Sequence, residues 1–253
     1  MARYVPHWLQ GSIITIAKGG NTTSWKPVEC MAELPIEAYQ HDRIGDGRMP
    51  YVQLDLLCHR VSDTSTQAII SVFLQIPWTG TESARRDERA KQASQTQPDG
   101  FRLLLEAYRR LDAGNCTHTP SFLGASATIQ GLDSWVPGGF VYYIGYTQVP
   151  GTQLGNSMIG RGFFYECPPE KQDVIREAFK EALISMGECG VASRSFPNPR
   201  HLYWLEESQK IFVTGSFQVS KRPWVWEPVE WIRWGLQEPP EEVFLLDLCD
   251  DRG

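Results

Sequence analysis

The chain has 253 residues, of which 42% are hydrophobic and 21% charged, so it can bury a sizeable core and is not wholly disordered. Its formal net charge of -6 argues against a nucleic-acid partner, because phosphate contacts depend on clustered Lys and Arg side chains. We find no signal peptide and no run approaching the roughly 18 apolar residues of a membrane span. We therefore expect a cytoplasmic protein with no membrane span, whose oligomeric state the sequence leaves unknown.

The cysteines and tryptophans are the unusual residues. The six cysteines are far apart in the sequence and lack CxxC spacing, so we expect reduced thiols and no metal site. They are Cys30, Cys58, Cys116, Cys167, Cys189 and Cys249. Five of the nine tryptophans follow residue 200, which points to an aromatic cluster near the C-terminal end.

The first half of the chain reads as β-rich. The first fifty residues look irregular, apart from a short strand at 12–16. Imperfect alternation of polar and apolar residues over 51–61 predicts a half-buried strand. The continuous β-branched run at 68–76 predicts a central strand.

A polar stretch at 79–100 lacks an apolar face, so we expect a solvated loop or an exposed helix there. The amphipathic segment 101–111 predicts a helix. Two further strands are expected at 121–129 and 140–148, with a Pro/Gly turn between them.

The second half of the chain predicts a helix and then short strands. One apolar stripe at i, i+4 and i+8 spacing predicts a helix that ends at Gly187 and Gly190. Its members are Val174, Ile175, Ala178, Phe179, Ala182, Leu183 and Met186. Strands are expected at 201–205 and 211–217, followed by a Trp-rich helix over 228–235.

The order of these segments, with their local motifs, resembles fungal protein-kinase-like proteins of the pseudokinase type. The segments that carry the resemblance are 68–77, 101–111, 116–124, 136–151 and 234–236. It implies an α+β, two-lobed kinase-like fold with a truncated helical C-lobe. Residues 1–150 would form a β-rich N-lobe with one helix equivalent to the kinase αC, and 151–253 a reduced C-lobe with a Trp-rich tail.

The kinase catalytic positions are degenerate in this chain. Ser71 stands where the resemblance places the phosphate-binding lysine, and Gly215 where it places a metal-binding aspartate. The catalytic base becomes Phe196, or Ser195 if one residue is inserted. Phosphoryl transfer depends on these charges and on Mg²⁺, so we expect no kinase activity, no metal and no cofactor.

Two residues remain as catalytic candidates. The resemblance places Glu106 at the αC glutamate and His201 at a metal-binding asparagine in the former catalytic cleft. A buried Glu106 could act as a general acid, and His201 as an acid or base near neutral pH. The alternatives are a solvated Glu106 paired with Arg109 or Arg110, and a His201 with no role in a site.

Aromatic residues would surround the same cleft and bind substrate. The predicted substrate-binding residues are Phe73, Trp135, Tyr142, Tyr146 and Tyr203. An apolar cleft with a few hydroxyl groups is typical of a site for a lipophilic small molecule. Ordinary core packing is the alternative for each of these side chains.

These observations predict a protein that has lost phosphotransfer and binds an apolar small metabolite. It could catalyse a cofactor-free cyclisation of the Diels–Alder type in secondary metabolism, since such a step needs only orientation and hydrogen-bond polarisation. One alternative is a non-catalytic pseudokinase that acts as a binding or scaffold protein. Another is residual or atypical nucleotide transfer.

Overall fold

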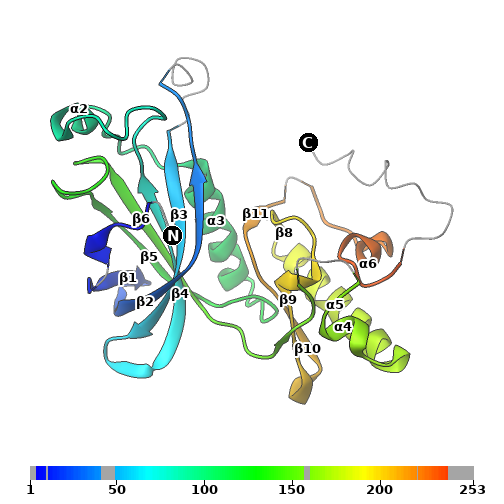
Figure 1. The fold of residues 1–253 in the computed structure, drawn as a ribbon. Coiled ribbons are helices and arrows are strands. Elements are labelled where there is room, and N and C mark those ends of the chain that lie inside the picture. The colour runs from blue at the N-terminus through cyan, green and yellow to red at the C-terminus, as the bar shows by residue number, and fades with distance from the viewer. Residues whose placement is uncertain (1–3, 10, 41–48, 157–159, 221, 239–253) are drawn as a thin grey trace. The chain divides into compact units, whose positions relative to one another are not determined.

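The computed structural model describes residues 4–9, 11–40, 49–156, 160–220 and 222–238 (Figure 1). The chain forms two compact units, one of residues 1–105 with 121–148 and one of residues 106–120 with 149–253. Helix α3 (Asp99–Ala113) contributes its first turns to the first unit and its last turns to the second.

The first unit is built on a closed antiparallel barrel with the strand order β1-β2-β3-β4-β6-β5. Its strands are β1 (Ile14–Lys18), β2 (Asn21–Ile36), β3 (Tyr51–Arg60), β4 (Asp63–Gln75), β5 (Phe122–Ile129) and β6 (Phe140–Thr147). The predicted strands at 51–61, 68–76, 121–129 and 140–148 are confirmed within a few residues, and β4 is central, between β3 and β6.

Strand alternation fills the barrel interior. Successive side chains point to opposite faces of a strand, so every second residue of β3 and β4 enters the barrel. These inward residues form one buried apolar cluster, which includes Val52, Leu54, Leu56 and Cys58 of β3 and Ala68, Ile70, Val72 and Leu74 of β4. The barrel therefore has a packed core.

The opposite face of β4 and β6 is also buried, beneath the start of α3. Phe101 of this helix stacks on Tyr142 at a ring-centroid distance of 4.5 Å and meets Phe73 edge-on at 5.6 Å. Burial on both faces explains why β4 is a continuous apolar run rather than an alternating one.

The barrel closes at a seam between its first strand and β5. Ala17 of β1 is paired with Ala125. The neighbouring Gly124 has a φ of +137°, and a Cβ there would lie 2.6 Å from the carbonyl oxygen of Ala17. Only glycine can follow this path, because any side chain would collide with the backbone across the seam.

In its described residues, the second unit combines short strands with three further α-helices besides the last turns of α3. They are β7 (Thr152–Gln153), α4 (Phe163–Glu166), α5 (Pro169–Glu188), β8 (Val191–Ser193), β9 (Leu202–Leu205), β10 (Lys210–Val213), β11 (Phe217–Val219) and α6 (Val229–Arg233). The predicted strand at 211–217 is two strands, because the chain turns at Gly215 between β10 and β11.

Helix α5 organises this unit. Its predicted apolar stripe is buried except for Val174, which is 41% exposed. Phe179 in the stripe meets Trp226 at 6.1 Å and Trp234 at 5.5 Å. Trp224 packs so closely on the helix that a Cβ at Gly187 would lie 2.6 Å from its ring. The tryptophans thus cover one side of α5.

The expected two-lobed kinase-like fold with a helical C-lobe is wrong. The structure is mostly β, with a closed six-stranded barrel and five α-helices in the described part of the chain, including α2 (Arg86–Ala90). Residues 21–36, expected to be irregular, form the 16-residue strand β2, which pairs with both β1 and β3. This strand allows the sheet to close.

Candidate functional site

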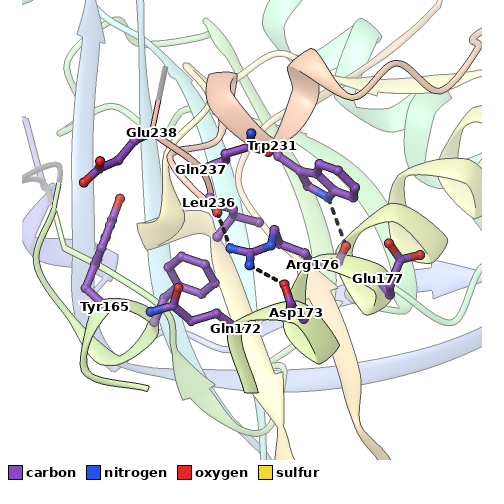
Figure 2. A pocket seen from close by; sticks show the side chains of 10 residues that line it. Tyr165, Gln172, Asp173, Arg176, Glu177, Trp231, Leu236, Gln237 and Glu238 are labelled. Carbon is purple, nitrogen blue, oxygen red and sulfur yellow. Dashed lines mark hydrogen bonds and ion pairs between the residues drawn. The ribbon is translucent and has the colours of Figure 1, made fainter. Parts of the chain in front are cut away.

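A cavity of about 850 Å³ lies in the second unit (Figure 2). Its walls come from α4, the first turns of α5, α6 and the residues that follow α6. The lining residues are Phe164, Tyr165, Gln172, Asp173, Arg176, Glu177, Trp231, Leu236, Gln237 and Glu238. Ligand pockets for small organic molecules occupy roughly 300–1,000 Å³, so this volume is suitable for one.

Local sequence signals bring these walls together. Pro169 is the first residue of α5, a position where proline fits because no helical partner for its nitrogen is needed. Gly235 follows α6 with a φ of +66°, the left-handed conformation that ends helices. This turn directs Leu236 back toward α5.

Arg176 holds the cavity wall in place. Its Nη1 donates to the carbonyl oxygen of Leu236 at 3.0 Å, and its Nη2 lies 2.5 Å from Oδ1 of Asp173. The indole nitrogen of Trp231 donates to the backbone carbonyl of Arg176 at 3.2 Å. These contacts join α5 to α6 and to the residues after it, so Arg176 is a structural cation here.

The cavity has both apolar and polar surfaces. Phe164 and Leu236 are almost fully buried, whereas Trp231 and Tyr165 are half-buried and present their rings. The Tyr165 hydroxyl donates to the carbonyl of Gly235, which fixes the orientation of its ring. A ligand could therefore stack on aromatic surface.

The charge of the lining is negative. Three carboxylates, those of Asp173, Glu177 and Glu238, face a single guanidinium, and Asp173 is paired with it. In Figure 2, Glu238 and Glu177 lie on opposite sides of Arg176. Glu177 also contacts Lys180 at 3.4 Å on the helix surface, and exposed ion pairs of this kind are weak. The cavity thus favours neutral or cationic ligands over phosphates.

The first unit contains a separate polar cluster of Asp55, Ser71 and Tyr146, called the Asp55 cluster below. Ser71 is fully buried, and its hydroxyl donates to Oδ1 of Asp55 at 2.5 Å and lies 3.1 Å from the Tyr146 hydroxyl. Gln53 donates to the same carboxylate oxygen at 3.2 Å. The three members come from the neighbouring strands β3, β4 and β6.

Burial dominates the electrostatics of this cluster. Desolvation raises the pKa of Asp55 above its ordinary value, and the hydrogen bonds from Ser71 and Gln53 oppose that rise. The pKa of Tyr146 is also raised, first by burial and then by the negative charge of Asp55. Both groups therefore favour their protonated forms, a property typical of acid–base sites as well as of some structural networks.

The five predicted substrate-binding aromatics lie in different surroundings. Phe73 and Tyr142 pack against Phe101 under α3, and the Tyr142 hydroxyl donates to the Gln95 carbonyl at 2.8 Å. Trp135 packs edge-on against Tyr4 at 5.3 Å. Tyr146 belongs to the Asp55 cluster. Tyr203 lies on β9, paired with Phe212 of the neighbouring strand.

The two predicted catalytic residues belong to the second unit. Glu106 is exposed, and its Oε1 lies 3.1 Å from Nε of Arg110. This matches the alternative in which Glu106 is solvated and paired with an arginine of its own helix. His201 is half-buried, and its Nε2 accepts from Nε of Arg200 at 3.1 Å. Burial, followed by the positive charge of Arg200, lowers the pKa of His201.

Gly215 brings His201 close to another polar side chain. A Cβ at Gly215 would lie 2.5 Å from Oγ of Ser195 and 3.2 Å from Nδ1 of His201. The Ser195 hydroxyl oxygen accepts from the backbone nitrogen of Ser216 at 2.8 Å. There is thus no room for an aspartate where the resemblance places a metal ligand.

In the described ranges no three His, Cys, Asp or Glu side chains gather as a metal site would require.

Sequence reasoning missed the cavity, because six of its ten lining residues are ordinary polar or charged residues. It also left Asp55, which lies in the predicted strand at 51–61, unpaired with Ser71. The signal was available, because a carboxylate inside an apolar strand needs a partner.

Within the described part of the chain, every helix is too short or too polar to cross a bilayer.

Comparison with known proteins gives no family for this chain. No family model matches it, and no curated protein matches it. A solved structure of WaaP in complex with acyl carrier protein is 14% identical and has a TM-score of 0.39, with 80% of this chain and 78% of that chain covered. This structural similarity is distant and carries no inference about fold or activity. The resemblance to fungal proteins stays a prediction.

Proposed function

We propose that this chain binds a small organic molecule with an apolar, aromatic body in the cavity between α4, α5 and α6. The supporting observation is a cavity of about 850 Å³ that combines half-buried aromatic rings with three carboxylates and a single guanidinium. Pockets of this kind take affinity from apolar surface and orientation from a few polar groups. The proposal keeps only the apolar part of the predicted ligand and moves its site away from Phe73 and Tyr142.

The preferred ligand carries a positive charge or hydrogen-bond donors beside its aromatic part. Glu177 and Glu238 would accept from those donors, while Trp231 and Tyr165 would contact the ring. A cation near an aromatic face gains about 0.5–2 kcal/mol. A phosphate or carboxylate would instead meet like charge, so nucleotides are poor ligands for this cavity.

Two probes of one shape and opposite charge test this proposal. Tryptamine should bind with a Kd at least about tenfold lower than indole-3-propionate, which corresponds to about 1.4 kcal/mol. Isothermal titration calorimetry at low salt measures both. Glu177→Gln should reduce the preference, whereas Glu181→Gln, an exposed residue of α5 outside the lining, should leave it unchanged. Equal affinities, or no binding of either probe, would contradict the proposal.

The Asp55 cluster supports a second function, a cofactor-free cyclisation of a polyene or terpenoid precursor. The observation that favours it is the hydrogen-bonded group of Asp55, Ser71 and Tyr146, in which burial raises the pKa of Asp55. A protonated Asp55 would polarise a substrate carbonyl. Asp55 would then be the acid, while Glu106 and His201 stay unassigned predictions. Binding at the cavity and acid chemistry at the cluster are independent proposals.

Product analysis with candidate polyene and terpenoid precursors tests this second function. Turnover should fall about 100-fold or more in Asp55→Asn, because general acid catalysis contributes at least that factor. Asp63→Asn, an exposed aspartate of the same unit, is the matched control and should retain wild-type turnover. Absence of turnover by the wild-type protein, or an undiminished rate in Asp55→Asn, would reject the cyclase proposal.

A further inference from the structure

We propose that Cys116 and Cys189 form a reversible disulfide, which makes them an oxidation site of the second unit. Both cysteines belong to this unit, although 72 residues separate them in the sequence. Cys116 lies just beyond the end of α3, and Cys189 caps the end of α5. Both are free thiols and half-buried, so a small oxidant can reach them.

The contacts of the two thiols place them together. The Ser185 hydroxyl donates to Sγ of Cys116 at 3.5 Å. Ser185 and Cys189 are four residues apart at the end of α5, so they lie on one face of the helix. Cys116 is also among the neighbours that raise the pKa of Cys189, after burial.

Gly114 allows this approach. The last turn of α3 ends one residue before it, and a Cβ at Gly114 would collide with Sγ of Cys189. The absence of a side chain lets the backbone after α3 pass close to the end of α5. Cys116 follows two residues later and contacts Ser185, one helical turn before Cys189.

The other described cysteines have different neighbours. Cys58 is fully buried in the barrel core, where no oxidant has access. Cys30 donates to the carbonyl of Ala32 at 3.4 Å, and Cys167 to the carbonyl of Phe163 at 3.1 Å. Among the described residues, Cys189 is the thiol whose pKa is raised by another cysteine, Cys116, after burial.

The reaction with hydrogen peroxide is balanced. One thiolate attacks a peroxide oxygen, the O–O bond breaks, and a sulfenic acid and hydroxide form. The second thiolate attacks the sulfenic sulfur, the S–S bond forms, and a second hydroxide leaves; each hydroxide takes up a thiol proton. The two thiols lose two electrons, and the peroxide is reduced to two waters. A small dithiol reverses the step by thiol–disulfide exchange.

Burial, followed by the nearby Cys116, raises the pKa of Cys189. Little Cys189 thiolate is therefore present at neutral pH, and the thiolate is the reactive form. Disulfide formation should accelerate with increasing pH. The cross-link would tie the end of α3 to the end of α5.

Peptide mapping of the full-length protein tests this proposal. After peroxide treatment and non-reducing trypsin digestion, we expect peptide 111–161 joined to peptide 181–194, lighter by two hydrogen atoms than the sum of the two. Dithiothreitol should restore both peptides. The cross-link should form faster at about pH 8.5 than at about pH 7, following the thiolate fraction.

Cysteine-to-serine variants show which thiols form the cross-link. Cys116→Ser and Cys189→Ser should each abolish the cross-linked peptide, and Cys167→Ser, an equally half-buried thiol, should not. The oxidised wild-type protein should melt at a higher temperature than its reduced form, because a cross-link restricts the unfolded chain. A partner other than Cys189 for Cys116, or sulfinic acids at both positions without a cross-link, would overturn the proposal.

Discussion

The Ser71 hydroxyl on β4 donates a 2.5 Å hydrogen bond to the carboxylate of Asp55, which is its direct partner in the ladder with β3. Ser71 is also the residue that the kinase resemblance aligned with a phosphate-binding lysine. A lysine would place a permanent positive charge beside Asp55, whereas Ser71 and Gln53, its hydrogen-bond partners among the described residues, are neutral. The chemistry of this cluster is therefore governed by burial.

Asp55 should make stability fall as the pH rises. Its pKa is raised in the folded state above its ordinary value of 3.8, so the folded protein binds more protons than the unfolded chain in the range above that value. The free energy of unfolding should decrease as the pH rises through the folded pKa. Urea unfolding of wild type and Asp55→Asn across pH 4 to 8 measures this. The free energy of unfolding of wild type should fall relative to that of Asp55→Asn as the pH rises.

Asp63 provides the opposite control. Hydrogen bonds from Ser65 and Thr66 lower its pKa, so the stability it contributes is present above 3.8 and is lost as the pH falls through the folded value. Asp63→Asn should reduce stability at neutral pH. If both aspartate variants shifted stability in the same direction at pH 8, the account of Asp55 would be wrong.

Arg200 should lower the pKa of His201. Burial is the larger cause, and the guanidinium charge adds to it. Arg200→Gln should therefore raise the pKa of His201, as measured by NMR titration of the imidazole proton. His118, whose pKa is also lowered mainly by burial, is the internal control and should not change. An unchanged His201 titration would show that the charge of Arg200 has no effect.

His201 should also affect stability in acid. Its depressed pKa means that the folded protein binds fewer protons than the unfolded chain below the ordinary value of 6.5. Stability should consequently be lost as the pH falls below 6.5. His201→Gln should show a smaller loss than wild type in urea unfolding between about pH 6.5 and 5.

Gly215 should not tolerate a side chain. Gly215→Ala combines a φ of +102° with a Cβ only 2.5 Å from Oγ of Ser195. Gly80→Ala is the matched control, because Gly80 has a φ of +88° with nothing within 4 Å of the added atom. The backbone strain of about 1–3 kcal/mol is common to both. Gly215→Ala should therefore be the less stable variant in urea unfolding, and equal losses would mean that Ser195 moves aside freely.

Arg176 should stabilise the cavity wall. Arg176→Lys keeps the charge but cannot hold both Leu236 and Asp173, so we expect a loss of about 2 kcal/mol in urea unfolding. Asp173→Asn should lower the free energy of unfolding by less, because the Asp173 side chain is 71% exposed. A larger loss from Asp173→Asn than from Arg176→Lys would show that the ion pair, and not the bond to Leu236, secures the wall.

Strong local patterns in the sequence predicted β4 and α5 correctly. The apolar run at 68–76 and the stripe ending at Met186 both report burial that packing imposes directly. Strand β2 was missed because it includes Pro27 and Pro35 and has register shifts after Pro27 and Cys30. Trp25 is its one fully buried side chain, so no alternation was left to detect.

The candidate site was harder to predict than the fold elements. The cavity joins Phe164 and Arg176 to Trp231 and Leu236, and periodicity within one segment gives no information about contacts between distant segments. The Cys116–Cys189 contact was hidden by the same sequence distance. Tyr146 was selected because the resemblance places it at the cleft, but its neighbours Asp55 and Ser71 were recognised only from the register of three strands.

The seam between Ala17 and Ala125 has a consequence for biosynthesis. The hairpins that join β1 to β2, β2 to β3 and β3 to β4 can form in the order in which the ribosome releases them. The first strand cannot complete its pairing until β5 has emerged, more than one hundred residues later. During translation the edge of β1 is therefore open, and short length is one of the means by which proteins limit unwanted pairing at such an edge.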